Sequence, residues 1–306
     1  MNKDFFKKTR ILDGGMGQEL LNKGLKPKGT LWSAHALIDS EYHQMIIDTH
    51  LDFINAGAEV IVTTTFTARK LRLRENNCEK YFENINIKAV ELAKKARDIS
   101  KKNVLIAAGL PNQKQTYDSY LGEDLNLIEQ NFYEQAKLLS NGVDFIYLDV
   151  MGSGLECEIA LRSIENFDLP VLVGIHLKDN GLLPSKEKIE DVINKYKSKK
   201  WLGVIMACIS PSAYEIVINS LKKINFPYGF KLNAFQHIPE GYTVADKDAW
   251  GDAGNPTTIL GINKDLNEDN FYNYAKKFME NGATILGGCC EIRPSHIKKI
   301  SQLKNL

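Results

Sequence analysis

Short runs of apolar, mostly β-branched residues alternate along the chain with longer segments whose apolar positions recur at a helical period. This alternation predicts parallel β-α units, because a helix after each buried strand returns the chain to the same edge of a sheet. We predict strands at residues 11–13, 60–66, 104–109, 145–150, 171–176, 203–208, 230–233 and 284–287. We predict helices at residues 41–55, 81–100, 127–141, 155–165, 186–197, 213–223 and 269–281, and a last one after Pro294.

Glycines mark several boundaries between these units. The pairs Ala56-Gly57, Asn141-Gly142 and Asn281-Gly282 each close a predicted helix and supply a left-handed position that ends it. No Pro/Ser-rich linker, low-complexity tract or change in composition divides the chain, so we expect residues 1–306 to form one domain. Eight units in this length predict an α/β protein that folds as a single (β/α)8 TIM barrel, with an open doubly wound sheet as the alternative.

Composition narrows the classes of partner. Of the 306 residues, 43% are hydrophobic, and 39 Lys and Arg are balanced by 38 Asp and Glu, so no excess of charge favours nucleic acid or an anionic membrane. The N-terminal residues are charged, and no apolar stretch has the length of a membrane span. We therefore expect a cytoplasmic protein that binds small molecules, and homo-oligomers remain open. The odd count of five cysteines argues against a disulfide framework.

Three cysteines fall at the ends of predicted strands, where barrel enzymes place their chemistry. Cys208 ends the sixth strand, and Gly287-Gly288-Cys289-Cys290 ends the eighth. Closure of a barrel would bring these thiols together, and the two glycines would permit the turn that lets both neighbouring cysteines face one metal. Three thiolates on Zn²⁺ leave one tetrahedral position open, which is typical of a catalytic site. The alternative is that these cysteines are small buried hydrophobic residues.

The open position indicates the chemistry. A thiol that enters it would be held as the thiolate, which is the nucleophilic form and suits attack on an electrophilic methyl group. We therefore predict a zinc-dependent methyltransferase with a thiol acceptor. A zinc hydrolase is a distant alternative, because activation of water favours His and carboxylate ligands with a general base. A non-catalytic thiol- or zinc-binding protein on the same scaffold also remains open.

The chain resembles the homocysteine S-methyltransferase family nearly from end to end. The resemblance implies an eight-stranded β/α barrel and a three-cysteine zinc that binds the sulfur of homocysteine, with Cys208, Cys289 and Cys290 as its ligands. The motifs that carry it are Leu12-Asp13-Gly14-Gly15-Met16-Gly17, Leu31-Trp32-Ser33-Ala34, His50 ahead of Ala56-Gly57-Ala58, and Gly282-Ala283 leading into Gly287-Gly288-Cys289-Cys290.

The resemblance also implies roles for substrate-binding residues. Asp13 and Asp149 would hold the amino group of homocysteine, and backbone amides near Gly14 and Gly15 would receive its carboxylate. This agrees with the residue types, because an ammonium needs carboxylate partners and glycine lets backbone donors approach a ligand closely. The other interpretation of Asp13 is a turn residue before two glycines.

The chain departs from the family's pattern at the substrate face. Asp149-Val150 stands where the family has Glu followed by Thr, and Ala207 and Thr64 each stand where the family has Asn. The motif of strand seven is reduced to Asn233. A different thiol, a longer thiol or a re-formed homocysteine pocket is compatible with these changes.

The methyl donor is predicted from the length of the chain and its aromatic residues. There is no room for folate or cobalamin modules, so we expect a small methylated cation, with S-methylmethionine as first choice. Dimethylsulfoniopropionate, betaine and S-adenosylmethionine are the alternatives. Trp32 and Phe66 are candidates to hold such a cation by cation–π attraction, and His176 at the end of strand five is a further candidate pocket residue, with Thr64 and Asn233.

Overall fold

A computed structural model describes residues 4–239, 242 and 254–305 of the chain. Its eight strands form one parallel sheet in the order β1-β8-β7-β6-β5-β4-β3-β2. A parallel bridge between Leu12 and Val60 joins the end of β1 to β2 and closes the ring, so the predicted TIM barrel is confirmed. The strands are β1 (Arg10–Ile11), β2 (Val60–Val62), β3 (Leu105–Pro111), β4 (Phe145–Met151), β5 (Val171–Ile175), β6 (Trp201–Ile209), β7 (Tyr228–Leu232) and β8 (Ile285–Gly288).

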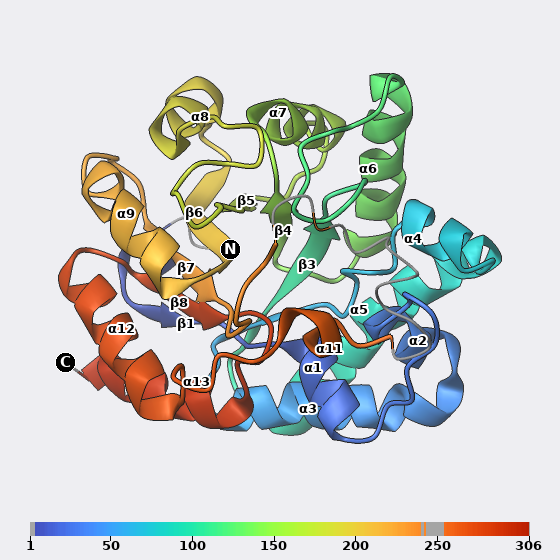
Figure 1. The fold of residues 1–306 in the computed structure, drawn as a ribbon. Helices are drawn as coiled ribbons and strands as arrows, with labels where there is room; N and C mark the ends of the chain where they lie inside the picture. Colours follow the sequence, from blue (N-terminus) through green and yellow to red (C-terminus); the bar gives the residue numbers. More distant parts are fainter. Residues whose placement is uncertain (1–3, 240–241, 243–253, 306) are drawn as a thin grey trace.

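A ring of helices surrounds the strands (Figure 1). The eight predicted helices are present, with ends that differ from the predicted ones by a few residues. Several are capped as their sequences indicate: the Ser210 hydroxyl accepts the N–H of Ala213, with Pro211 at the first helical position. The helices are α3 (His43–Asn55), α5 (Phe82–Ser100), α6 (Leu125–Leu139), α7 (Gly154–Ser163), α8 (Ile189–Tyr196), α9 (Pro211–Leu221), α12 (Glu268–Glu280) and α13 (Pro294–Ile300).

Shorter helices lie in the connections between strands and helices. They were not predicted, because segments this short do not show a helical period. The α-helical ones are α1 (Met16–Asn22), α2 (Ser33–Ile38), α4 (Lys70–Glu75) and α11 (Thr257–Leu260). The 3₁₀ turns are η1 (Phe5–Lys7), η2 (Ser40–Tyr42), η3 (Glu79–Tyr81) and η5 (Ser301–Asn305). Of these, α1, α2 and α4 follow β1 and β2, which places them at the carboxyl ends of the strands.

The predicted helix-ending glycines are confirmed. Gly57, Gly142 and Gly282 have φ of 107°, 101° and 98°, respectively. A side chain at Gly282 would also meet the Tyr228 hydroxyl, 2.4 Å from the position of a Cβ. These residues therefore end the helices before β2, β4 and β8 in a conformation that favours glycine.

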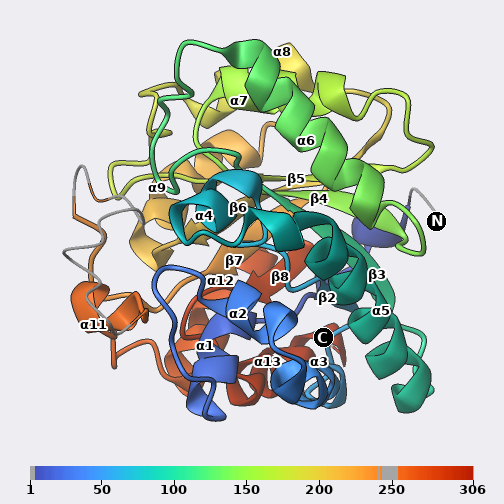
Figure 2. The ribbon, with the colours of Figure 1, turned by 90° about the vertical axis from the view of Figure 1, so that its right-hand side faces the viewer.

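The barrel is filled at the amino ends of its strands. Phe6 of η1 is fully buried, packs edge-on against Phe145 at 5.8 Å, and accepts a hydrogen bond from the Thr284 hydroxyl to its backbone oxygen. Apolar side chains from most strands pack above it, among them Leu172 and Ile205. Figure 2 shows the N-terminus and α11 at opposite ends of the barrel. Among the described residues, apolar side chains therefore fill the barrel interior at the amino ends of the strands, and the site cavity lies toward their carboxyl ends.

Two strand ends differ from prediction in a way that shapes the site. The second strand ends at Val62 instead of Phe66, and residues 63–66 form a loop. The eighth strand includes Gly287 and Gly288, so the chain turns only after Cys289. Among the described residues no helix is long and apolar enough to cross a membrane.

Candidate active site and metal centre

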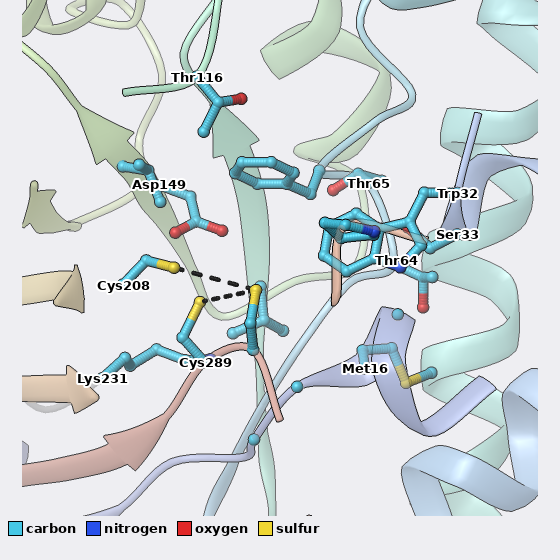
Figure 3. Close-up of a pocket in the computed structure, with 18 of the residues that line it drawn as sticks. Met16, Trp32, Ser33, Thr64, Thr65, Thr116, Asp149, Cys208, Lys231 and Cys289 are labelled. Atoms are coloured by element: carbon cyan, nitrogen blue, oxygen red, sulfur yellow. Dashed lines mark hydrogen bonds between the residues drawn. The ribbon is translucent and has the colours of Figure 1, made fainter. Parts of the chain in front are cut away.

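A cavity opens at the carboxyl ends of the strands (Figure 3). Its walls are contributed by strand ends and loops from most of the barrel, so residues far apart in the sequence meet there. Of the predicted residues it is lined by Asp13, Gly14, Gly15, Trp32, Thr64, Phe66, Asp149, Cys208, Cys289 and Cys290. His176 and Asn233 instead line a neighbouring cavity on the far side of Cys208.

The three predicted cysteines lie together in the reduced state. Cys208 Sγ is 3.9 Å from Cys290 Sγ, Cys289 Sγ is 3.8 Å from Cys290 Sγ, and all three sulfur atoms lie within 4.8 Å of one another. A tetrahedral ion with Zn–S bonds of about 2.3 Å requires S···S separations of about 3.8 Å. The thiols therefore fit a zinc-sized ion with little movement, and we call this set the cysteine triad.

A turn directly after β8 brings the thiols of Cys289 and Cys290 to the same side of the chain. The Cys289 N–H donates to Leu232 O of β7 at 2.7 Å, and the Ile292 N–H returns to Cys289 O at 3.0 Å. Glu291, with φ of 61°, makes the reversal. Gly288 is not the turn residue that the sequence suggested: its missing side chain makes room for Ile292, whose Cγ2 would lie 2.1 Å from a Cβ.

Cys208 and Cys290 are buried, Cys289 is partly exposed, and the three thiols affect one another's ionisation. Burial opposes ionisation of Cys208, yet hydrogen bonds with Cys289, Cys290 and Tyr117 bring its pKa well below the usual value. Interaction with Cys208 raises the pKa of Cys290 well above the usual value. One thiolate is therefore favoured before a metal binds, and the other thiols would release protons as the metal binds.

Tyr117 is a site residue that sequence analysis missed. It lies in the loop after β3, and its hydroxyl is 3.1 Å from Cys208 Sγ. Its ring packs 4.6 Å from that of His176, whose Nδ1 lies 3.2 Å from Ala207 O. Burial lowers the pKa of His176 to about 4, so this side chain is a neutral support for Tyr117. No motif marks Tyr117, because the loop after a strand has no periodicity that fixes its path.

Asp13 has protein partners on both carboxylate oxygens. Oδ2 accepts the Val62 N–H at 2.7 Å, and Oδ1 accepts a hydrogen bond from Lys231 Nζ at 2.7 Å in a buried ion pair. The Gly15 N–H, predicted to face a substrate carboxylate, donates to Ile292 O at 2.8 Å. These contacts favour a supporting role for Asp13 and Gly15 over direct contact with substrate. Lys231 was not predicted from the sequence.

The predicted donor-side aromatic residues form one wall of the cavity. Trp32 and Phe66 pack edge-to-face with ring centroids 6.1 Å apart. Gly17 leaves room for the indole, because a Cβ there would lie 2.4 Å from Trp32 Cε2. Thr64 also lines the cavity, and its hydroxyl is 3.3 Å from His50 Nε2. Asn233 instead caps a turn, where its side-chain oxygen accepts the Phe235 N–H at 3.0 Å.

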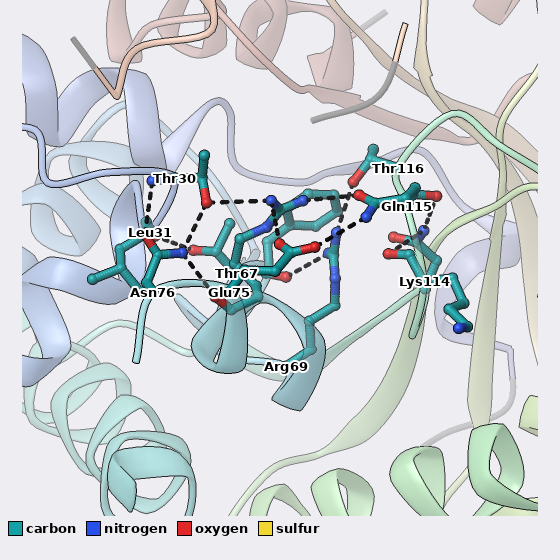
Figure 4. Close-up of polar contacts among 12 residues, drawn as sticks. Thr30, Leu31, Thr67, Arg69, Glu75, Asn76, Lys114, Gln115 and Thr116 are labelled. Carbon is teal, nitrogen blue, oxygen red and sulfur yellow. Dashed lines mark hydrogen bonds and ion pairs between the residues drawn. The ribbon is translucent and has the colours of Figure 1, made fainter. Parts of the chain in front are cut away.

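A buried arginine network supports this wall (Figure 4). The Arg69 guanidinium donates to Phe66 O at 3.0 Å and to the Thr116 hydroxyl at 2.9 Å, and lies 5.2 Å from the centroid of the Phe66 ring. Arg72 is also fully buried and pairs with Glu75 at 2.8 Å. Burial, with the nearby Arg72 charge, lowers the pKa of Arg69 to about 9. The network ties α4 to the loop after β3 and so fixes Phe66 at the cavity edge.

Comparison with known proteins decides the family of this chain. The sequence profile described as homocysteine S-methyltransferase matches residues 10–303. The chain belongs to the homocysteine S-methyltransferase family. It is thus an enzyme of the methyltransferase class.

Individual relatives agree with this assignment. Homocysteine S-methyltransferase 2 of Arabidopsis thaliana is 23% identical, with 97% of this chain and 94% of the relative covered. Selenocysteine methyltransferase of Astragalus bisulcatus is 24% identical, with 97% and 92% covered. The metallated form of the homocysteine methyltransferase MmuM from Escherichia coli superposes with a TM-score of 0.78 at 18% identity, over 99% of this chain and 100% of that one.

Strained backbone is concentrated at the site of this methyltransferase. Among the described residues, eight residues other than glycine have a positive φ. Four of them, Trp32, Tyr117, Val150 and Cys208, line the cavity, and Glu291 follows the last cysteine of the triad. β-branched residues rarely adopt a left-handed conformation, as Val150 does here. Val150 lies where the register of β4 shifts, next to Asp149. Such strain persists where the surrounding structure fixes a functional side chain.

Asp149 gives the metal-free methyltransferase a pH-dependent stability. Burial, with the nearby Cys289, raises the pKa of Asp149 from 3.8 to about 7. At a pH between these two values, Asp149 is protonated in the folded chain and ionised in the unfolded chain. Stability therefore falls as pH rises through this window. We expect Asp149→Asn to raise the free energy of unfolding of metal-free protein at pH 8 by about 1–2 kcal/mol, because the cavity leaves the carboxylate partly hydrated. Urea unfolding at pH 8 and pH 4 tests this, and an equal difference at both values would contradict it.

Proposed function

We propose that this methyltransferase moves a methyl group from a small sulfonium donor, with S-methylmethionine as first choice, to the thiol of homocysteine held at a zinc ion on Cys208, Cys289 and Cys290. Methionine is the product in the acceptor half of the reaction. The observation that carries the proposal is the cysteine triad itself, three reduced thiols at tetrahedral separations in the wall of a cavity. Family membership supports the same acceptor.

Different residues of this chain would bind the metal and the acceptor. When bound, zinc would keep the acceptor sulfur as a thiolate at neutral pH. The triad would occupy three ligand positions and leave the fourth to the acceptor, directed into the cavity. Asp149 lines the same cavity and supplies a carboxylate toward the acceptor's amino group.

The aromatic wall fits a cationic donor. Figure 3 shows Trp32 across the cavity from Cys208 and Cys289. A sulfonium or quaternary ammonium against the Trp32 and Phe66 rings would be stabilised by cation–π attraction, with its methyl group directed toward the triad. The mostly apolar walls would exclude water and so favour transfer of the methyl group to the acceptor sulfur over loss of the donor to hydrolysis.

The free cysteines also indicate the cellular compartment. All five are free, and Cys157 and Cys208 are deeply buried. A reducing compartment such as the cytoplasm would keep a thiol triad competent for metal binding. We therefore propose a cytoplasmic location.

The deciding measurement is detection of methionine by mass spectrometry from homocysteine labelled with ³⁴S and zinc-loaded protein. S-methylmethionine, dimethylsulfoniopropionate, glycine betaine and S-adenosylmethionine are offered in separate reactions. We expect labelled methionine with S-methylmethionine, at a rate at least about a hundredfold above that of Trp32→Ala, because loss of an aromatic clamp removes both packing and cation–π attraction.

Labelling matters here because S-methylmethionine itself becomes methionine when it loses a methyl group. Labelled product with another donor, and none with S-methylmethionine, would replace the donor in this proposal. No labelled product from any of the four, by protein that retains zinc, would overturn methyl transfer to homocysteine.

A further inference from the structure

Lys231 is a buried cation in the wall of the acceptor cavity. It is the fourth of the five residues of β7, its neighbours Phe230 and Leu232 pack against the outer helices, and its own side chain points into the barrel. Lys231 is 6% exposed as a residue, and its Nζ lies 5.9 Å from the centroid of the Tyr147 ring. Of the described residues that line this cavity, it is the one that carries a positive charge.

The charge of Lys231 is fixed by its neighbours. Burial opposes the ammonium, but the Asp13 and Asp149 carboxylates outweigh this and raise its pKa. Asp13 supplies the direct contact, at 2.7 Å, and is itself held by the Val62 N–H. Because a lysine ammonium has three donors and Asp13 takes one, donors remain for an anion in the cavity.

Two of the groups predicted from the sequence to bind the acceptor, the Asp13 carboxylate and the Gly15 amide, are engaged with other protein groups. Asp13 holds Lys231 and the Gly15 N–H bonds to Ile292 O, so neither is directed at a ligand. Without Lys231, an acceptor carboxylate would enter a cavity lined by Asp13, Asp149 and the triad, all groups of negative or potentially negative charge. Such a cavity would repel a carboxylate.

We propose that Lys231 binds the carboxylate of the acceptor thiol, with Asp13 as its positioning residue and Asp149 as the partner of the amino group. The acceptor class is therefore a mercapto-carboxylate, whose carboxylate is the anchoring group and whose amino group is secondary. Homocysteine belongs to this class, as does a thiol acid without an amino group. This inference rests on the proposed function, because it places the acceptor sulfur at the triad.

The register of the strands places Lys231 near the triad. Lys231 pairs with Gly287, which is two residues before Cys289. Two residues of strand correspond to a rise of about 6.6 Å between backbone positions, and the Lys231 side chain lines the same cavity as the triad. Figure 3 shows Lys231 next to Cys289, so the carboxylate of a thiol bound at the triad would lie near the Lys231 side chain.

Binding of three matched thiols to cobalt-loaded protein tests the assignment. Cobalt occupies thiolate sites and gives a sulfur-to-cobalt absorption band, so entry of an acceptor thiol is seen without turnover. The probes are homocysteine, 4-mercaptobutyrate, which lacks the amino group, and 3-aminopropane-1-thiol, which lacks the carboxylate. The variant is Lys231→Met with Asp13→Asn, which removes both charges of the pair and leaves no buried charge unpaired.

The two thiols with a carboxylate should lose roughly ten- to hundredfold in affinity in the double variant, the range of a charge-assisted hydrogen bond, whereas 3-aminopropane-1-thiol should bind within about threefold of wild type. Asp149→Asn should give the reverse pattern and spare 4-mercaptobutyrate. Equal losses for all three thiols, or unchanged homocysteine binding, would overturn the role of Lys231 while leaving the proposed function intact. If no thiol changes the cobalt band of the wild type, the proposed function itself fails.

Discussion

Replacement of Cys290 by alanine is expected to abolish stable metal binding and to lower methyl transfer by at least about a thousandfold. The central sulfur of the triad is within 3.9 Å of both other thiols, so its loss leaves two ligands that cannot enclose a tetrahedral ion. The nucleophile is lost with the metal, because a free thiol is mostly protonated at neutral pH. Metal content by mass spectrometry, together with methionine formation, measures both effects.

Cys78→Ala provides the matched control. Cys78 is also a buried, free cysteine, but it lies between α4 and η3, outside the triad. We expect this variant to keep one metal per chain and near wild-type turnover. Full metal content and activity in Cys290→Ala would show that the triad is not the metal centre.

Removal of Lys231 alone is expected to destabilise the metal-free fold by about 3–5 kcal/mol, the usual cost of leaving one member of a buried ion pair without its partner. Burial raises the pKa of Asp13, and the ammonium counteracts this, so without Lys231 the Asp13 carboxylate must either remain charged in the barrel or take up a proton. The free energy of unfolding of Lys231→Ala in urea at pH 7.5 measures the cost.

Two comparisons separate a charge effect from lost packing. Lys231→Met with Asp13→Asn should cost less than about 2 kcal/mol, because a buried pair can be replaced by neutral groups of similar volume at little cost. The penalty of Lys231→Ala should also shrink as pH falls and Asp13 becomes protonated. A penalty that is the same in both variants, and independent of pH, would mean that the ion pair contributes little.

The barrel and the triad were predictable from the sequence, for physical reasons that act locally. Strands buried on both faces appear as apolar runs, and helices that cover them appear as amphipathic segments, so the units could be counted. Once the ring was inferred, the ends of the strands at Cys208 and Cys289 had to lie on one face. The meeting of the three thiols followed from topology without knowledge of any distance.

The substrate side was less predictable, because side-chain partners depend on packing between distant elements. Lys231 stands between Phe230 and Leu232 in a predicted strand, and a charge inside a closed barrel requires a partner, so this signal could have been used. Nothing in the sequence links Lys231 to Asp13, which is 218 residues away. The position of Tyr117 depends on the fold of a loop, for which the chain carries no periodic pattern.

The separation of the triad along the chain gives the metal a mechanical consequence as well. Cys208 and Cys290 are 82 residues apart, so an ion shared between them would cross-link β6 to the end of β8 and close a loop that contains α9, β7, α11, α12 and β8. In the chain-entropy treatment of cross-links, closure of a loop of this length is worth about 4–5 kcal/mol. Metal loss would therefore release a large part of the C-terminal third of the barrel from its tether, so that the ion secures the architecture that holds it.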